Sequence, residues 1–318
     1  MLSGILLIDK PEGLSSFAVV RRARRVFGVR KVGHLGTLDP FATGLSPLCL
    51  GEATKLAPYL LPGAKTYRAT LQLGVATDTQ DLTGQVISRT EALPMADQIY
   101  QTSARFIGEI QQVPPLYSAL HHQGQRLYKL ARRGEKVELP PRPVTIYRLA
   151  VEEINLPWVT IMVKCSQGTY VRTLAADLGA ALGCGAHLTA LRRLEIGPFR
   201  LEDAITLEAL EHGGLEVGLA RIIPLHACLP GMRQVKVDSA EAAKVRQGQA
   251  LVWEAADFHP EELVQMLTAG EMLALARVRR LEDLVVLAPV RVFLGNQPAA
   301  VSDAPKPKAA SKIAEQIG

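Results

Sequence analysis

The chain has 318 residues, of which 48% are hydrophobic and 21% are charged, and its formal net charge is +5. A chain of this length predicts one large and one small domain with a sizeable core. No apolar run approaches the ~20 residues of a membrane-spanning helix, and the apolar N-terminal run is too short for a secretory signal. We therefore expect a cytoplasmic protein with no membrane partner.

The cysteines are too widely spaced for a metal or redox motif. No C-x-x-C pair occurs, which argues against a zinc site or a redox centre. In a long chain without a secretion signal, such cysteines are most often buried free thiols. They are Cys49, Cys165, Cys184 and Cys228.

The basic residues are concentrated in two stretches. Residues 20–31 contain six arginines and lysines and no acid, and residues 117–148 contain seven against two acids. Such patches in a nearly balanced protein favour a polyanion as partner. The alternative for either patch alone is an ordinary solvated helix face.

The chain begins with a buried-type strand over 4–8 and an amphipathic helix over about 17–27. Ser15 or Ser16 can cap this helix. Its apolar residues fall on one arc and its four arginines on the other. Lys10, between the two elements, is either a functional residue or a solvated lysine at the helix entry.

Residues 33–55 predict a constrained loop that is anchored by a strand. Gly36 permits a left-handed backbone and Pro40 makes the preceding residue extended. A short apolar strand from Gly44 and a helix over 52–61 follow. The polar residues of the loop are His34, Thr37 and Asp39. Asp39 before a proline can also be a simple turn former.

Three further segments carry candidate residues. Residues 65–74 alternate with period two, which predicts a half-buried strand, so Tyr67 is a core tyrosine or a functional one. A polar loop over 77–84 is expected to shape a turn. A helix is predicted over 95–106, and Tyr117 and Tyr128 interleave with basic residues within 113–148, as in surfaces that stack bases and bind phosphates.

Two strands over 143–154 and 158–166 lead to a turn at Gly168 and a helix. Tyr170 and Arg172 flank the apolar stripe of this helix at its start. They are either rim residues or pocket residues. A strand over 188–196 follows.

The composition changes near residue 229. Strands near 272–279 and 284–293 predict a small β-rich module that folds as an independent unit. Residues 297–318 are rich in Ala, Pro, Lys and Ser, which predicts a disordered tail.

Five motifs, in order, resemble the TruB family, the tRNA pseudouridine-55 synthases. The most specific is GHLGTLDPFATGLSP at 33–47. The others are GILLIDKPEGLSS at 4–16, KTYRATLQLG at 65–74, CSQGTYVRTL at 165–174 and LRRLEIGPF at 191–199. The stretch VPPLYSALHHQGQRLYKLARRGE resembles an RNA-covering insertion of the family, with His121 or His122 where the family has lysine. More weakly, residues 273–293 resemble the last strands of a PUA-type domain.

This resemblance implies an α+β fold, the pseudouridine synthase fold, with a mixed, mostly antiparallel sheet flanked by helices. It divides the chain into a catalytic domain at 1–228 that includes the insertion at about 113–148, a PUA-like RNA-binding domain at 229–296 and a tail at 297–318. It implies isomerisation of uridine to pseudouridine at position 55 of the tRNA T-loop after base flipping. The reaction needs no cofactor and no metal.

The resemblance also implies roles for individual residues. Asp39 would act on the sugar, on the base or on a sugar proton, and Arg172 would keep it ionised. Tyr67 would receive the flipped base and accept or relay a proton, Tyr170 would pack in the pocket wall, and His34 would fill the gap left by the flipped nucleotide. The expected substrate-binding residues are His34, Lys10, Thr37, Arg132, Arg133, Lys129 and Leu194.

The expected partner is the T-arm of tRNA, bound by a monomer without a guide RNA. Two alternatives stay open. The basic patches also suit a non-catalytic protein that binds or folds RNA, although such a protein has no need for Asp39, Tyr67 and Arg172 together. A synthase of the guide-RNA-dependent dyskerin type is the other alternative.

Overall fold

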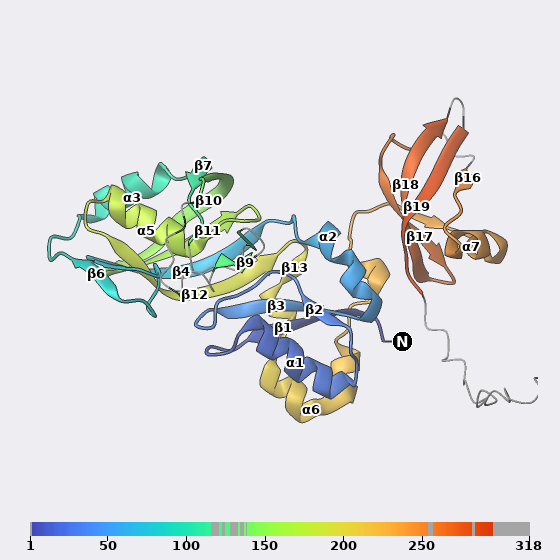
Figure 1. Cartoon of the computed structure of the whole chain (residues 1–318), viewed down its shortest axis with the longest axis horizontal. Coiled ribbons are helices and arrows are strands. Elements are labelled where there is room, and N and C mark those ends of the chain that lie inside the picture. Colours follow the sequence, from blue (N-terminus) through green and yellow to red (C-terminus); the bar gives the residue numbers. More distant parts are fainter. Residues whose placement is uncertain are drawn as a thin grey trace, which may run out of the picture.

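The computed structural model describes residues 2–115, 121–122, 125–127, 133, 137, 139–253, 257–281 and 284–294. Figure 1 shows a large sheet with helices packed on it and a smaller sheet set apart at one end of the molecule. Within the described ranges, no helix is long and apolar enough to cross a membrane.

The large sheet has ten strands, most of them antiparallel to their neighbours. Its order is β14-β1-β3-β12-β4-β11-β10-β7, with β2 paired to β3 and β13 to β12. Of the described pairs in this sheet, β1–β14 and β3–β12 are parallel. This confirms the predicted mixed, mostly antiparallel sheet. The strands are β1 (Gly4–Lys10), β2 (Val32–His34), β3 (Thr43–Leu50), β4 (Lys65–Leu73), β7 (Gly108–Gln112), β10 (Arg142–Asn155), β11 (Trp158–Cys165), β12 (Ala186–Ile196), β13 (Phe199–Arg200) and β14 (Ile205–Thr206).

Helices cover the two halves of this sheet with separate apolar clusters. One cluster joins α1 (Ser16–Phe27) and α6 (Leu207–Ala220) to β1 and β3. The other joins α3 (Ala96–Ala104) and α5 (Val171–Ala181) to β4, β11 and β12. Figure 1 shows the two pairs of helices at opposite ends of the large sheet. Short 3₁₀ turns complete this part as η1 (Gly51–Leu56), η2 (Leu201–Asp203) and η3 (Leu225–Ala227).

Helix α1 follows from its sequence as predicted. The Ser15 hydroxyl caps it by accepting from the Ala18 amide, and Gly28 ends it in the left-handed conformation with φ of 62°. Its apolar face is buried, whereas two arginines serve the fold: Arg22 pairs with Glu211 at 3.4 Å, and Arg24 donates to a carbonyl of β2.

The helix predicted over 52–61 is divided in two. Residues 51–56 form the 3₁₀ turn η1, and α2 (Ala57–Leu60) follows it. Pro58 lies in the first turn of α2. Because proline has no amide hydrogen, it suits the start of a helix but cannot continue one.

The small sheet has five strands in the order β15-β17-β18-β19-β16. Helix α7 (Ser239–Arg246), capped by Asp238, packs on it. Two hairpins lie outside both sheets: β5 (Val75–Thr77) with β6 (Val86–Arg89), and β8 (His121–His122) with β9 (Gln125–Arg126). The strands of the small sheet are β15 (Gln234–Lys236), β16 (Leu251–Trp253), β17 (Leu263–Thr268), β18 (Glu271–Leu281) and β19 (Leu284–Val292).

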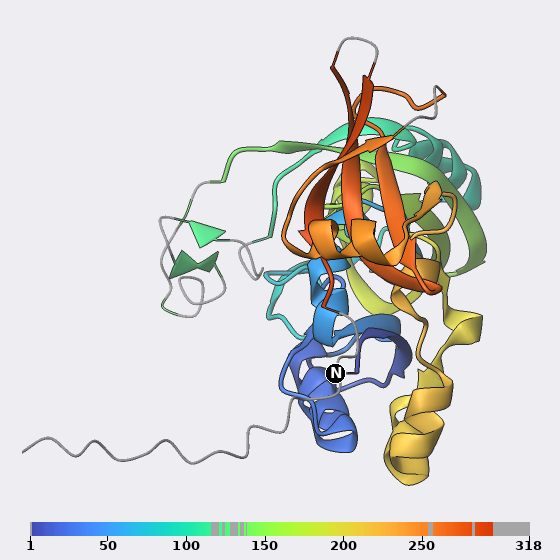
Figure 2. The same ribbon diagram turned by 90° about the vertical axis from the view of Figure 1, so that its right-hand side faces the viewer.

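The small sheet shares an apolar cluster with the large one. Leu275 and Phe293 pack in one cluster with Leu56 and Leu60. Two hydrogen bonds add to this contact, because Lys55 donates to the Val292 carbonyl at 2.8 Å and Glu52 accepts from the backbone amide of residue 294 at 3.1 Å. Figure 2 views the molecule from the end that carries the small sheet. The boundary at 228/229 and the independence of the module stay predictions.

Phe293 tests how strongly this shared cluster ties the two sheets together. Phe293→Ala should lower the free energy of unfolding by about 3–5 kcal/mol, because a side chain that is 1% exposed leaves a cavity. Urea unfolding measures this loss. Leu294→Ala is the matched control, since its side chain is 67% exposed and its loss should stay within about 0.5 kcal/mol. Equal losses in the two variants would show that the sheets are not joined through Phe293.

Candidate active site

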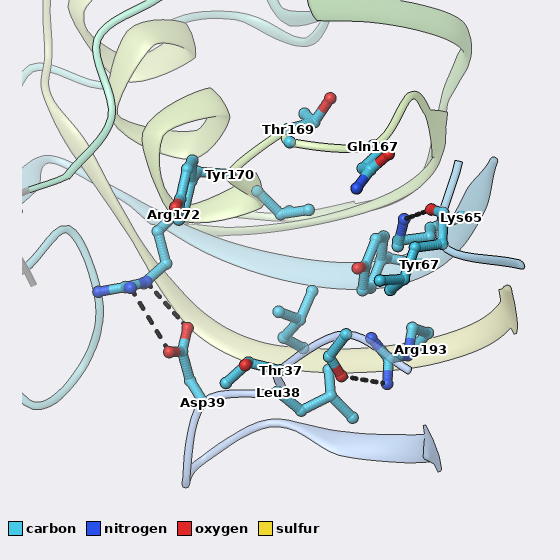
Figure 3. A pocket seen from close by; sticks show the side chains of 15 residues that line it. Thr37, Leu38, Asp39, Lys65, Tyr67, Gln167, Thr169, Tyr170, Arg172 and Arg193 are labelled. Atoms are coloured by element: carbon cyan, nitrogen blue, oxygen red, sulfur yellow. Dashed lines mark hydrogen bonds and ion pairs between the residues drawn. The ribbon is translucent and has the colours of Figure 1, made fainter. Parts of the chain in front are cut away.

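A cavity of about 280 Å³ opens where the loop between β2 and β3 meets the start of α5. Strands β4 and β12 form its floor (Figure 3). Its lining residues are Gly36, Thr37, Leu38, Asp39, Leu61, Lys65, Tyr67, Gln167, Gly168, Thr169, Tyr170, Val171, Arg172, Leu191 and Arg193.

The loop that carries Asp39 is fixed on both sides. The Ser16 hydroxyl bonds to both the amide and the carbonyl of Leu38, at 2.8 and 3.2 Å. At the far end, β3 approaches β12 so closely that a Cβ on Gly44 would lie 2.3 Å from a backbone oxygen of Arg193. Only glycine fits there. The loop is therefore constrained, as its sequence predicted.

Lys10 braces the same loop from beneath. Its side chain is fully buried, and Nζ donates to the carbonyls of Pro11, Leu14 and Pro40 at 2.9, 2.7 and 3.2 Å. Burial lowers the pKa of Lys10 to about 8, while the nearby Asp39 carboxylate opposes this change. We expected Lys10 to contact RNA, but its complete burial makes it a brace of the loop.

Arg172 joins Asp39 to a second carboxylate. Its Nε lies 3.0 Å from Oδ2 of Asp39, and its Nη2 donates to Oδ1 at 3.5 Å. On its other side, Nη1 lies 3.2 Å from Oδ2 of Asp81. The Arg172 and Asp81 side chains are each 5% exposed, whereas that of Asp39 is 33% exposed. The buried pair therefore holds a guanidinium that presents Asp39 at the cavity.

Asp81 has a partner for both carboxylate oxygens. Its Oδ1 accepts from the Thr79 hydroxyl at 2.7 Å and from the amide and hydroxyl of Thr83 at 2.9 and 2.6 Å. We expected the loop over 77–84 to shape a turn only. The turn also positions Arg172. In the sequence, the threonines on both sides of Asp81 were the one indication that this carboxylate is buried and fully hydrogen-bonded.

Burial and the neighbouring charges together determine the protonation state of Asp39. Burial raises the pKa of the Asp39 carboxyl above its usual 3.8, and the charge of Asp81 adds to this increase. Arg172 and Lys10 lower that pKa. The carboxylate form of Asp39 therefore depends chiefly on Arg172.

Tyr67 and Arg193 form the floor of the cavity. Tyr67, 6% exposed on β4, lies directly opposite the fully buried Arg193 on β12. Burial raises the pKa of the Tyr67 hydroxyl, and the charge of Arg193 opposes this. Arg193 was not predicted as a site residue. Leu194, which was, is half-buried and absent from the described lining, where Leu191 lies instead.

The remaining predicted site residues are spread more widely. Tyr170 lines the cavity, and its amide and carbonyl both bond to the Gln112 side chain. Thr37 is exposed at the rim. His34, on β2, is half-buried outside the described lining, and burial lowers its pKa.

Part of the predicted RNA-covering insertion lies outside the described residues. Arg133 is described and is exposed. The predicted roles of the other insertion residues, and the disordered tail at 297–318, concern undescribed positions. The insertion residues with predicted roles that lie outside the described part are Tyr117, Tyr128, Lys129 and Arg132.

The described part of the chain contains no group of three or more His, Cys, Asp or Glu side chains that could hold a metal ion. All four cysteines are buried free thiols, as predicted. The titratable side chains that line the cavity are those of Asp39, Lys65, Tyr67, Tyr170, Arg172 and Arg193.

Two family models match consecutive parts of the chain. The N-terminal domain of TruB family pseudouridylate synthases matches residues 24–171, and the C-terminal domain of tRNA pseudouridylate synthase B matches 172–223. Their common boundary falls at the start of α5, the helix that connects β11 and β12 of the large sheet. The paired residues Asp39 and Arg172 thus lie one in each matched region.

Curated relatives and solved structures agree with these matches. A tRNA pseudouridine synthase B of Burkholderia pseudomallei is 51% identical over 250 residues, which cover 79% of this chain and 83% of the relative. One of Dechloromonas aromatica is 47% identical over 78% of this chain and 83% of its own. Among solved structures, a chain of a Cbf5-Nop10-Gar1 complex has a TM-score of 0.70 at 29% identity, covering 92% of this chain and 85% of its own. A chain of an H/ACA RNP bound to a substrate RNA has a TM-score of 0.70 at 27% identity, with the same coverage.

Because two carboxylates pair with Arg172, removal of its guanidinium should greatly reduce the stability of the fold. Arg172→Met should lower the free energy of unfolding by about 3–5 kcal/mol, because Asp81 is left buried without its cation. Urea unfolding at several pH values measures this. Without Arg172 the pKa of the Asp39 carboxyl, which burial already raises, should rise further above its unfolded value. The folded variant then binds more protons, and the loss should shrink as pH falls.

Arg192→Met is the matched control for this variant. Arg192 pairs with Asp9 at 2.7 Å, but its side chain is 42% exposed. Removal of such a pair should cost no more than about 1 kcal/mol. If Arg172→Met costs no more stability than this control, Arg172 does not hold Asp81 as described. If its cost does not depend on pH, Arg172 does not stabilise the carboxylate form of Asp39.

Proposed function

Because the chain belongs to the TruB family of pseudouridylate synthases, we propose that it converts uridine to pseudouridine at position 55 in the T-loop of tRNA. The observation that carries this proposal is the Asp39 carboxylate, which a buried guanidinium holds at the mouth of a cavity floored by a tyrosine. A protein that only binds or folds RNA has no use for this arrangement.

The chemistry requires the groups that the cavity brings together. Breaking the N-glycosidic bond develops positive charge on the sugar, and a carboxylate stabilises or traps such charge in glycosidases. Asp39 is the carboxylate in this role, and Arg172 keeps it ionised and oriented. Because Asp81 fixes Arg172 from behind, the carboxylate is in place before substrate arrives.

The target base must leave its stack to reach Asp39. Enzymes that act on a base within folded RNA extrude it into a pocket and receive it on an aromatic face. Tyr67 offers this face from the cavity floor, and Tyr170 packs in the wall. His34, close to the loop but outside the lining, would support the RNA from which the base is withdrawn.

The relatives favour action on tRNA without an accompanying ribonucleoprotein. Curated relatives at 46–51% identity are named tRNA pseudouridine synthase B, whereas the chains from ribonucleoprotein complexes share 27–29% identity. We propose that this protein acts in the same way as the former, as a cytoplasmic monomer that needs no guide RNA. The described residues within 229–296 contribute nothing to the cavity lining, so the proposed role of this segment is to contact RNA away from the chemistry.

Asp39→Asn tests the proposed reaction. The wild-type protein alone should form pseudouridine on an unmodified tRNA transcript, and a mass-shift assay after derivatisation or tritium release measures this. Asn keeps the size and hydrogen bonding of the side chain but removes its charge, so turnover should vanish while tRNA binding persists. Appreciable turnover by Asp39→Asn would refute the catalytic role of this carboxylate. An inactive wild type on all tRNA transcripts would refute the function.

The pH dependence of the reaction tests the state of Asp39. Because the carboxylate form is the active one and burial raises the Asp39 pKa, kcat/KM should fall on the acid side at a pH above the ordinary aspartate value of 3.8. Binding of tRNA, measured over the same range with Asp39→Asn, controls for effects on the RNA contact. A rate that is constant down to 3.8 would show that ionisation of a buried Asp39 is not required.

A further inference from the structure

Arg193 has the largest of the fully buried side chains among the described residues, and it lies beside Tyr67. The two residues face each other across the antiparallel strands β12 and β4, where opposite side chains point to the same face of the sheet. Both line the cavity that contains Asp39. In Figure 3 the Arg193 guanidinium lies between Tyr67 and the loop that carries Thr37.

Two of the three guanidinium nitrogens of Arg193 have partners in the fold, and the third does not. Nε donates to the Leu45 carbonyl at 2.7 Å, and Nη2 donates to the Gly36 carbonyl at 3.2 Å. Nη1 is buried without a hydrogen-bond partner in the described structure. None of the ion pairs between described residues involves Arg193.

A buried cation with an unused donor is costly to the folded state. Removal of the Nη1 donor by a shorter side chain would avoid that cost, yet the fold keeps the guanidinium pinned in place through its other two nitrogens. The unused donor therefore points to negative charge that arises in the cavity during the reaction.

We propose that Arg193 is a positioning residue that acts through Tyr67. Its Nη1 donates to the Tyr67 hydroxyl oxygen and stabilises negative charge there while that oxygen takes a proton from C5 of the base. The inference rests on the proposed function and extends it to a residue that the sequence did not single out.

The isomerisation requires one such proton transfer. When C1′ of the sugar bonds to C5 of the uracil, C5 still carries its hydrogen, which must leave as a proton. The electron pair of the C5–H bond restores the C5=C6 double bond. The N1=C6 electron pair then returns to N1, which has lost the sugar and takes a proton from water. The Tyr67 oxygen accepts the C5 proton while its own hydroxyl proton passes to water. A neighbouring cation lowers the barrier to this exchange, because the oxygen is partly negative during it.

Arg193 is the cation placed to have this effect on Tyr67. Burial raises the pKa of Tyr67, and Cys165 and Asp39 raise it as well, whereas Arg193 lowers it. Burial also raises the pKa of the Cys165 thiol to about 11, so this neighbour is uncharged near neutral pH. Lys65, on the same strand, donates to two backbone carbonyls of the preceding turn.

A double-mutant cycle tests the inference. Single-turnover pseudouridine formation at saturating tRNA is measured for the wild type, Arg193→Met, Tyr67→Phe and the double variant. Arg193→Met should slow the reaction roughly 10²-fold, as loss of one donor to a developing oxyanion does, with tRNA affinity unchanged. In the Tyr67→Phe protein, which lacks the hydroxyl, the same substitution should change the rate by less than about twofold. A rise in rate at alkaline pH is expected as the Tyr67 hydroxyl ionises. This rise should move to higher pH in Arg193→Met, because the Tyr67 pKa increases when the cation is lost.

Two further variants keep the outcome clear. Arg192→Met removes the neighbouring guanidinium of β12, which bonds to Asp9 instead, and its effect should be the same with and without the Tyr67 hydroxyl. Arg193→Lys keeps the charge and is used in place of Arg193→Met if that variant does not fold. Its loss of rate should be smaller and should also be absent in the Tyr67→Phe background. Equal losses from Arg193 substitutions in both backgrounds would overturn the inference while the proposed function stands. An inactive wild type would overturn both.

Discussion

The site depends on one guanidinium that is held from behind. A flexible arginine on the surface would orient Asp39 poorly. Each rotatable bond of its long side chain would have to become ordered when substrate binds. Asp81 removes this freedom: its buried carboxylate binds Nη1, and Thr79 and Thr83 satisfy its other oxygen. The fold thus bears the cost of ordering, and only Asp39 is left partly exposed to act.

The architecture brings these groups together from distant parts of the chain. Asp39 follows β2, Asp81 follows β5, and Arg172 begins α5. The loop of Asp39 is fixed by Ser16 and by Lys10, which comes from the end of β1. A basic residue in the first motif therefore holds the backbone of the loop that carries Asp39.

Much of this could be predicted from the sequence. The Gly and Pro spacing around Asp39 indicated a constrained loop, the alternation around Tyr67 indicated a half-buried strand, and the helix with Arg172 at its start was evident from its apolar stripe. The roles of Asp81 and Arg193 could not be predicted. Each depends on which strand or loop becomes the neighbour in space, and local spacing carries no information on the register between β4 and β12.

The Arg172 cluster also sets a limit on how far the protein could be stabilised. Burying charges in this way gains little stability, and replacing a buried ion pair or triad by well-packed apolar side chains is often neutral or favourable for folding. Stability could therefore increase only if Asp39, Asp81 and Arg172 were replaced together by apolar side chains, because loss of one member alone leaves a buried charge without its partner.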